Sequence, residues 1–258
     1  MSPKFRLDFL DKNFQSVEKR DDMLVEYITL QNQLDNYEKA MELTAKYKFH
    51  PWEGGEGKIT SQYVISRMQL AMRAINDGNF AKALELLNET NQYPHNLGEG
   101  KLINAKENDI DCVKGLAYNG TGNAEGAKQR FLKATQGDNE PHQAFFYNDQ
   151  SPDKILYQGL AWRELGDEAK AKELFKKLIA HGEKHMNDNC KIDYFAVSLP
   201  DLAIWEDDLN VRNKIHCHYV IGLGYFGLND KKKASEHLDK VLELDVNHQG
   251  AQIHKTMI

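Results

Sequence analysis

The chain has 258 residues, of which 41% are hydrophobic and 28% are charged, and its formal net charge is −6. One ordinary hydrophobic core would be near its size limit at this length, so we expect either two domains or one elongated array. The acidic balance, with no concentrated basic face, argues against a nucleic-acid ligand, because phosphate contacts need Lys and Arg side chains.

The sequence also argues against a membrane protein and against a disulfide framework. Charged residues interrupt every apolar run near Met1, and no apolar stretch approaches the roughly 18 residues of a membrane span. The three cysteines, Cys112, Cys190 and Cys217, lack the C-x-x-C spacing of a zinc site. We therefore expect buried reduced thiols, a cytoplasmic location, no membrane contact, and no metal or other cofactor.

Residues 1–22 are polar and charged, and we expect a leading helix or arm there. Phe5, Phe9 and Leu10 can form one weak apolar face on such a helix. We expect this Phe-bearing segment to cover the first repeat of the array, and the short tail 251–258 to cover the last one.

Five helical hairpins are predicted between residues 23 and 250. Each is marked by a short polar turn and by an alanine three or four residues later. A Gly or Asn at each turn suits the left-handed residue that closes one helix, and the Asp or Asn beside it suits the start of the next. The turns begin at Asp35, Gly78, Gly122, Gly166 and Asn229, and the alanines are Ala40, Ala83, Ala127, Ala171 and Ala234.

The hairpins resemble tetratricopeptide repeats, which place a small residue and an aromatic in the first helix and Ala-x-x-x-Phe in the second. The first-helix pairs here are Gly115 with Tyr118, Gly159 with Trp162, and Gly222 with Tyr225; the second-helix pairs are Ala127 with Phe131, and Ala171 with Phe175. The resemblance implies an all-α fold, a right-handed α-solenoid of about five hairpins in which neighbours bury each other's apolar faces. It also implies a protein or peptide partner.

The repeats are longer than those of the family they resemble. The alanines are 43, 44, 44 and 63 residues apart, against about 34 in an ordinary repeat. We place the extra residues in the links between hairpins, at 49–59, 91–103, 137–151 and 182–210. In a solenoid such links emerge on one edge, so we expect a row of long loops there.

The links carry aromatic residues beside acids and amides, and from this pattern we predict ligand contacts. Flat aromatic faces next to carboxylates and amides suit a polyhydroxylated ligand such as a saccharide. The alternative is that the aromatics pin the loops to the helices and the acids cap helix starts. The candidate ligand-binding residues are Trp52, Glu56, Glu99, Tyr147, Asn148, Asp149 and Tyr194, together with His216 on a predicted helix.

The link segments are also similar to the C-terminal repeat region of a family of large bacterial proteins of unknown function, which is often associated with carbohydrate use. The similar segments are 52–57, 96–101, 147–150 with Pro152 and Asp153, 193–202, and 216–224. This resemblance implies that the chain corresponds to the repeat region alone, and it implies no known activity.

The apparent phosphate-loop and zinc-protease motifs of the sequence are incomplete. Gly55-Glu56-Gly57-Lys58 is not a phosphate loop, because Ile59 follows the lysine where Ser or Thr is required. Equivalent loops on adjacent hairpins should lie about 10 Å apart. Such a spacing permits, without requiring, a Glu56–Glu99 pair like the carboxyls of inverting glycosidases, which are roughly 6.5–9.5 Å apart. His181 and His185 fit no zinc-protease signature, and Gly182 predicts that their helix is ending.

The sequence thus predicts a non-enzymatic scaffold that holds a protein or peptide on its concave face or loop edge. The chaperone-type clamp for acidic C-terminal peptides is not expected, because Met68, Gln69 and Met72 stand on the first helix of the second repeat. The alternative function is an accessory module of a carbohydrate-processing protein, contacting a saccharide or a catalytic domain through the loop edge.

Overall fold

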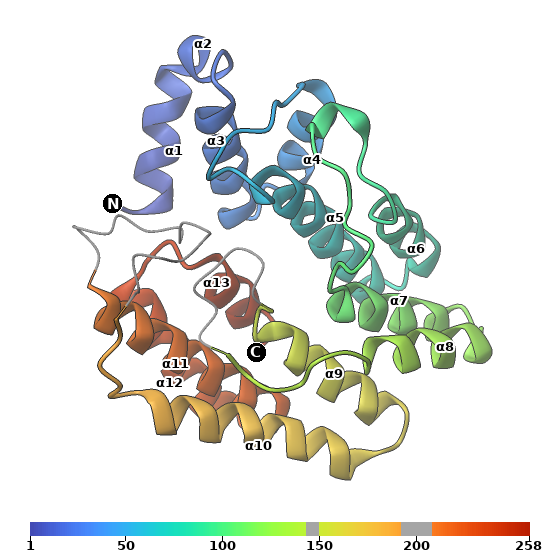
Figure 1. Cartoon of the computed structure of the whole chain (residues 1–258). Coiled ribbons are helices and arrows are strands. Elements are labelled where there is room, and N and C mark those ends of the chain that lie inside the picture. Colours follow the sequence, from blue (N-terminus) through green and yellow to red (C-terminus); the bar gives the residue numbers. More distant parts are fainter. Residues whose placement is uncertain (143–149, 192–207) are drawn as a thin grey trace. The chain divides into compact units, whose positions relative to one another are not determined.

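The computed structural model describes residues 1–142, 150–191 and 208–258 (Figure 1). Within these residues the chain is all-α, with thirteen α-helices, one short 3-10 helix and no strand. The all-α solenoid class expected from the sequence is confirmed. No helix in these three ranges is both long and apolar enough to cross a membrane.

The chain divides into two compact units, which are described separately. Unit 1 comprises Met1–Ala105 and Val113–Gln129, and unit 2 comprises Lys106–Cys112 and Arg130–Ile258. The division passes through one helical hairpin, so that hairpin contributes residues to both units.

In unit 1 the helices pair as antiparallel hairpins behind two short leading helices. The elements are α1 (Pro3–Lys12), α2 (Phe14–Val17), α3 (Asp21–Gln33), α4 (Tyr37–Lys46), α5 (Lys58–Asn76), α6 (Phe80–Glu89) and η1 (His95–Leu97). Helices α3 with α4, and α5 with α6, form the hairpins, and α4 packs on α5. The divided hairpin consists of α7 (Asn108–Gly120) and α8 (Ala124–Ala134).

Unit 2 contains two complete hairpins and a final helix. The elements are α9 (Asp153–Glu164), α10 (Glu168–His185), α11 (Leu209–Gly227), α12 (Lys231–Leu244) and α13 (Gln249–Thr256). Helix α10 packs on both α9 and α11, α11 packs on α12, and α13 closes against α12. The tail predicted at 251–258 is therefore part of a helix that packs on the last hairpin.

The five predicted hairpin turns are present. At four turns the left-handed residue is the predicted Gly or Asn, namely Gly78 (φ 73°), Gly122 (78°), Gly166 (84°) and Asn229 (62°), whereas at the first turn it is Asp35 (63°). At four of them the next side chain caps the second helix, since Asn79, Asn123, Asp167 and Asp230 each accept a backbone N–H three residues on. The five predicted alanines are all buried. Local sequence thus sets four of the turns by the expected mechanism, and the first turn lacks the side-chain cap.

The core of unit 2 forms around the ring of Phe175 on α10. A Cβ at Gly159 on α9 would lie 2.3 Å from the Phe175 ring, and one at Gly227 on α11 would lie 2.2 Å from it. A Cβ at Gly224 would lie 2.6 Å from the Phe175 carbonyl oxygen. Three glycines from two helices therefore make room for one aromatic residue and let α9 and α11 approach α10 closely.

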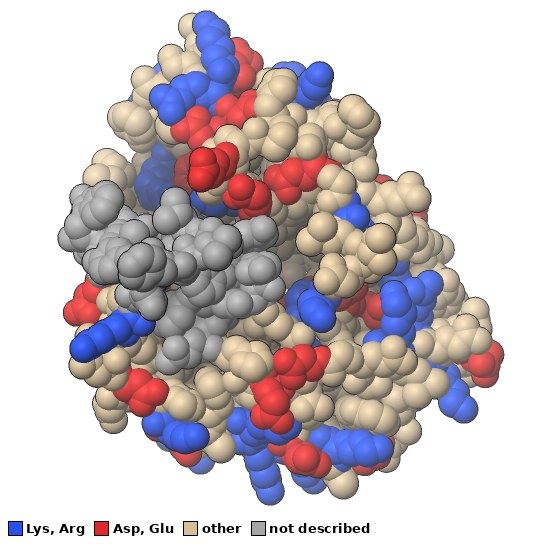
Figure 2. Space-filling view, in the orientation of Figure 1, with Lys and Arg blue, Asp and Glu red and all other residues tan. Residues whose placement is uncertain are grey.

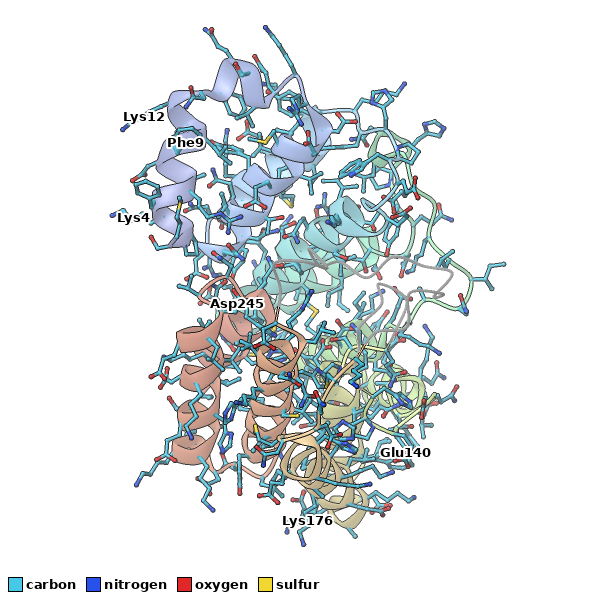
Figure 3. The ribbon with its side chains drawn as sticks, turned by 60° about the vertical axis from the view of Figure 1, so that its left-hand side comes forward. Lys4, Phe9, Lys12, Glu140, Lys176 and Asp245 are labelled. Carbon is cyan, nitrogen blue, oxygen red and sulfur yellow. The ribbon has the colours of Figure 1, made fainter. Side chains whose placement is uncertain are left out.

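The leading helix differs from the prediction in the face that it buries. Phe5 and Phe9 are each 59% exposed, whereas Leu7 and Leu10 are buried against α3. The i, i+3 pair of leucines and the i, i+4 pair of phenylalanines lie on different sides of the helix, and the leucine side faces the core. Lys4, Phe9 and Lys12 project together from the outer side of α1 (Figure 3).

Gly182 does not end a helix, contrary to the expectation from the sequence. Helix α10 continues to His185, and Gly182 is buried inside it. A Cβ there would lie 2.7 Å from the carbonyl oxygen of Cys217 on α11. The glycine therefore serves close helix packing, which local sequence cannot distinguish from a helix end.

The cysteines and the surface agree with the composition. Cys112, Cys190 and Cys217 are free thiols, and the first and last of them are buried while Cys190 is half-buried. Figure 2 shows Lys and Arg side chains interspersed with Asp and Glu along the edge that α10 forms. Lys170 pairs there with Asp167 at 3.0 Å, one turn apart. Exposed pairs of this kind contribute little stability, so the edge is a solvated surface.

We expect Gly159→Ala to lower the free energy of unfolding by about 1–3 kcal/mol, because its added methyl group would overlap the buried Phe175 ring. The matched control is Gly100→Ala, since a Cβ at Gly100 meets no atom within 4 Å. Urea unfolding of both variants measures the difference. Equal effects of the two substitutions would contradict the packing described around Phe175.

Candidate functional site

The two predicted loops of unit 1 lie side by side. The Phe49 amide donates to the Asn96 carbonyl at 2.7 Å, and the Gly57 amide donates to Glu99 Oε2 at 2.8 Å. The Asn96 side-chain amide donates to the carbonyl oxygens of Thr44 at 2.8 Å and Tyr47 at 2.6 Å. The second loop therefore satisfies backbone groups at the end of α4, and both loops are part of the packed fold.

The candidate ligand residues of these loops have structural contacts. Trp52 is half-buried against the core of unit 1, and a Cβ at Gly55 would lie 2.1 Å from its ring. Glu99 accepts from Gly57, the N-cap residue just before α5, where the helix dipole favours a carboxylate. Glu56 is exposed. Trp52 and Glu99 are half-buried, so Glu56 is the one exposed side chain of the three.

The remaining candidates divide into two groups. Tyr147, Asn148, Asp149 and Tyr194 lie outside the described residues. His216 lies within α11, with its ring centroid 6.3 Å from that of His181 on α10. It is therefore part of the helix packing of unit 2.

His216 and His218 contact different neighbours, as their i, i+2 spacing predicts. His216 faces His181 on α10, and His218 Nδ1 lies 3.1 Å from His237 Nδ1 on α12. Burial, then the neighbouring His181, lowers the pKa of His216 to about 4. Burial and His237 likewise lower the pKa of His218 to about 4. Both rings are therefore neutral at pH 7.

A cluster of buried polar residues in unit 2 was not predicted from the sequence. Lys154 Nζ lies 2.5 Å from Asp109 Oδ2 and 3.9 Å from Asp153 Oδ2. Tyr157 follows one turn later on α9, and its ring centroid lies 6.1 Å from that of His254 on α13. We call Asp109, Asp153, Lys154, Tyr157 and His254 the acceptor cluster.

Helix α11 supports this cluster through Tyr219. The Tyr219 hydroxyl lies 3.2 Å from His254 Nδ1, and a Cβ at Gly250 would lie 2.5 Å from the same hydroxyl. His254 Nδ1 also lies 2.7 Å from the Gly250 carbonyl oxygen. Because a carbonyl can only accept, Nδ1 carries the hydrogen, and Nε2 of His254 is left as an acceptor.

Several atoms of the acceptor cluster are buried without a partner among the described residues. They are Oδ1 of Asp109, Oδ1 of Asp153, the hydroxyl of Tyr157 and Nε2 of His254. Asp109, Tyr157 and His254 are 6%, 2% and 3% exposed. Native proteins rarely leave such groups unsatisfied, so each one calls for a water molecule or a ligand.

Opposing effects set the charges of the cluster. Burial raises the pKa of Asp109, although Lys154 opposes this shift. Burial also acts to raise the pKa of Asp153, but the charge of Lys154, with smaller contributions that include a hydrogen bond from Ser151, outweighs it, so that this pKa is lowered. For Lys154, burial acts to lower the pKa, but Asp109 and Asp153 outweigh it and the pKa is raised. Lys154 is therefore a charged ammonium between two carboxyl groups.

The repeat register is the sequence signal that could have pointed to this cluster. Asp153 follows Asp109 by 44 residues, the same offset that separates Ala127 from Ala171. Both aspartates stand in the first turn of a first helix of a hairpin. Taken singly, each is an ordinary acid at a helix start.

Among the described residues, no three His, Cys, Asp or Glu side chains are arranged to hold a metal ion. Neither the acceptor cluster nor the described histidines of α10, α11 and α12 form such a group. The unpartnered atoms of the cluster therefore do not mark a three-ligand metal site.

We expect Asn96→Ala to lower the free energy of unfolding by about 1–3 kcal/mol, because it leaves the Thr44 and Tyr47 carbonyl oxygens without their donor. His95→Ala, at the exposed neighbouring position, is the control and should change stability by less than about 0.5 kcal/mol. Thermal and urea unfolding of the two variants measure the effect. A neutral Asn96→Ala would mean that the loops do not depend on this contact.

We expect unit 2 to lose stability as the pH falls from about 6.5 to 4. The pKa of His216 is lowered to about 4 in the folded chain, so the unfolded chain takes up its proton first and is favoured. The loss is on the order of 3 kcal/mol for His216 once it is complete. Hydrogen exchange at pH 7 and pH 5 measures the loss for each unit, and His216→Gln should reduce it. An unchanged pH dependence in that variant would contradict the assignment.

Comparison with known families agrees with this architecture. Residues 155–181 match one model described as tetratricopeptide repeat, and residues 215–248 match a second model with the same description. The first match covers most of α9 and α10, and the second covers most of α11 and α12. Residues 155–181 and 215–248 are therefore similar to tetratricopeptide repeats, as the residue pattern predicted. Of the acceptor cluster, Tyr157 lies within the first matched segment.

Proposed function

We propose that this chain is a protein-interaction module whose binding surface includes the first helices of unit 2. The single observation that carries the proposal is the acceptor cluster, in which α7, α9 and α13 together hold buried polar atoms without partners. Tetratricopeptide repeats generally bind protein partners and are generally non-catalytic, and stacked repeats present an extended concave surface for binding. An extended segment of a partner protein fits this arrangement.

A saccharide contact at the loop edge, as an accessory part of a carbohydrate-processing protein, has less support. Trp52 packs against the core and Glu99 accepts a backbone N–H within the fold. A saccharide needs such groups to be presented to solvent, where they can stack on its rings and bind its hydroxyls. Glu56, which is exposed, keeps this second function open to test by Glu56→Gln in a glycan-binding assay.

Selection of random twelve-residue peptides against the full chain tests the proposed function. We expect enriched peptides whose binding protects α9, α11 and α13 from hydrogen exchange. Asp153→Arg should weaken these peptides about tenfold or more, because it places a bulky side chain of opposite charge in the acceptor cluster. Thermal unfolding of this variant checks that it is folded.

Lys172→Ala is the matched control, since Lys172 is exposed on α10, a second helix of its hairpin. It should leave peptide affinity unchanged. The proposal would be wrong if no peptide were enriched, or if the protected helices were α10 and α12.

A further inference from the structure

We propose that the acceptor cluster binds a primary ammonium group, supplied by a lysine side chain or by a free amino terminus of a bound polypeptide. This inference deepens the proposed function and rests on it for the identity of the polypeptide. The geometry supports it in three ways: the excess charge of the cluster, the kind of atoms left without partners, and the access of solvent to the cluster.

The cluster has one more acid than base. Lys154 lies 2.5 Å from Asp109, so these two side chains neutralise each other as a buried pair. Asp153 lies 3.9 Å from the same ammonium, too far for a good hydrogen bond, and its Oδ1 has no partner among the described residues. Burial lowers the pKa of His254, and the neutral ring that donates from Nδ1 to the Gly250 carbonyl offers no hydrogen from Nε2. A cation is therefore the ligand charge that completes the site.

The unpartnered atoms are mostly acceptors. Asp153 Oδ1 and His254 Nε2 can only accept, as can Oδ1 of Asp109 when that carboxyl is ionised, and the Tyr157 hydroxyl can accept or donate. An ammonium group carries three N–H donors and no acceptor, so it can satisfy several of these atoms at once. A carboxylate would find a single cation there, already engaged by Asp109, and it would be repelled by Asp153. The site is thus opposite in character to a clamp for an acidic terminus.

Solvent reaches the charged end of the cluster. The side chains of Lys154 and Asp153 each retain 17% of their exposure, whereas Tyr157 and His254 are almost fully buried. The site therefore has a charged entrance at the start of α9 and an aromatic interior formed with α13. The ammonium at the tip of a lysine side chain, or at an amino terminus, reaches the carboxyl groups of this entrance first.

Titration of the full chain, labelled with 13C at its histidine rings, tests the site directly. We expect n-butylammonium to shift the His254 resonance saturably, with a Kd on the order of millimolar for so small a probe. The uncharged isostere n-butanol should bind about tenfold more weakly or not at all. Asp153→Asn should raise the Kd for n-butylammonium about tenfold, because it removes the unpaired charge.

Asp230→Asn is the matched control. Asp230 caps α12 outside the cluster, and asparagine caps a helix as well as aspartate does, so the Kd should not change. Equal binding of n-butanol, an unchanged Kd in Asp153→Asn, or no saturable shift of His254 would overturn the proposal. The last result would mean that the acceptors hold only water.

Three pentapeptides distinguish the two sources of the ammonium. One has a blocked amino terminus and a central lysine, one has a free amino terminus and no lysine, and one has neither. Tighter binding of either charged peptide supports the proposal and names the source, and equal binding of all three would overturn a polypeptide source. The n-butylammonium titration needs no partner protein, so its outcome is independent of the peptide selection that tests the proposed function.

Discussion

The close approach of α9 and α11 to the ring of Phe175 is the contact on which unit 2 depends. A Cβ atom at Gly159 or Gly227 would overlap that ring, and Gly224 lies against the Phe175 backbone. A single hairpin cannot bury its apolar face alone, so a stack of hairpins is stable only where neighbouring helices can come this close. Glycine supplies the space, and the aromatic ring fills it.

The same close packing explains how polar groups come to be buried together. When α9 and α11 lie against α10, and α13 follows α12, the starts of α7 and α9 and the side chains of Tyr219 and His254 are drawn into one region. Buried charges are costly unless they are paired, and Lys154 with Asp109 meets that condition. Asp153 Oδ1 and His254 Nε2 have no partner among the described residues, and such buried atoms call for a water molecule or a ligand.

In unit 1 the polar residues of the loops have another role. The repeated Gly-Glu-Gly-Lys loops contact each other through Gly57 and Glu99, and Asn96 satisfies two carbonyls at the end of α4. The second loop thus supplies hydrogen bonds that the first hairpin lacks at its end. Acids and amides thus form hydrogen bonds within the fold in these loops. In the acceptor cluster, by contrast, several polar atoms have no partner among the described residues.

The sequence by itself determined the hairpins of this protein, because their signals are local. Gly78, Gly122 and Asn229 close helices by backbone conformation, and the neighbouring caps act within three residues, so no distant contact is needed to predict them. The repeat spacing likewise placed the buried alanines, such as Ala171. It also placed Gly159, which lies next to Phe175, and Gly222, which lies next to Leu238.

Only the tertiary structure decided which faces and which polar groups meet. Leu7 rather than Phe5 faces the core of unit 1, and Gly182 continues a helix because Cys217 lies against it. The Asp109–Lys154 pair joins residues 45 apart, and His254 reaches the cluster from the far end of the chain. Such contacts depend on how helices pack, and a periodic pattern specifies the packing face of a helix without naming the partner on the other side.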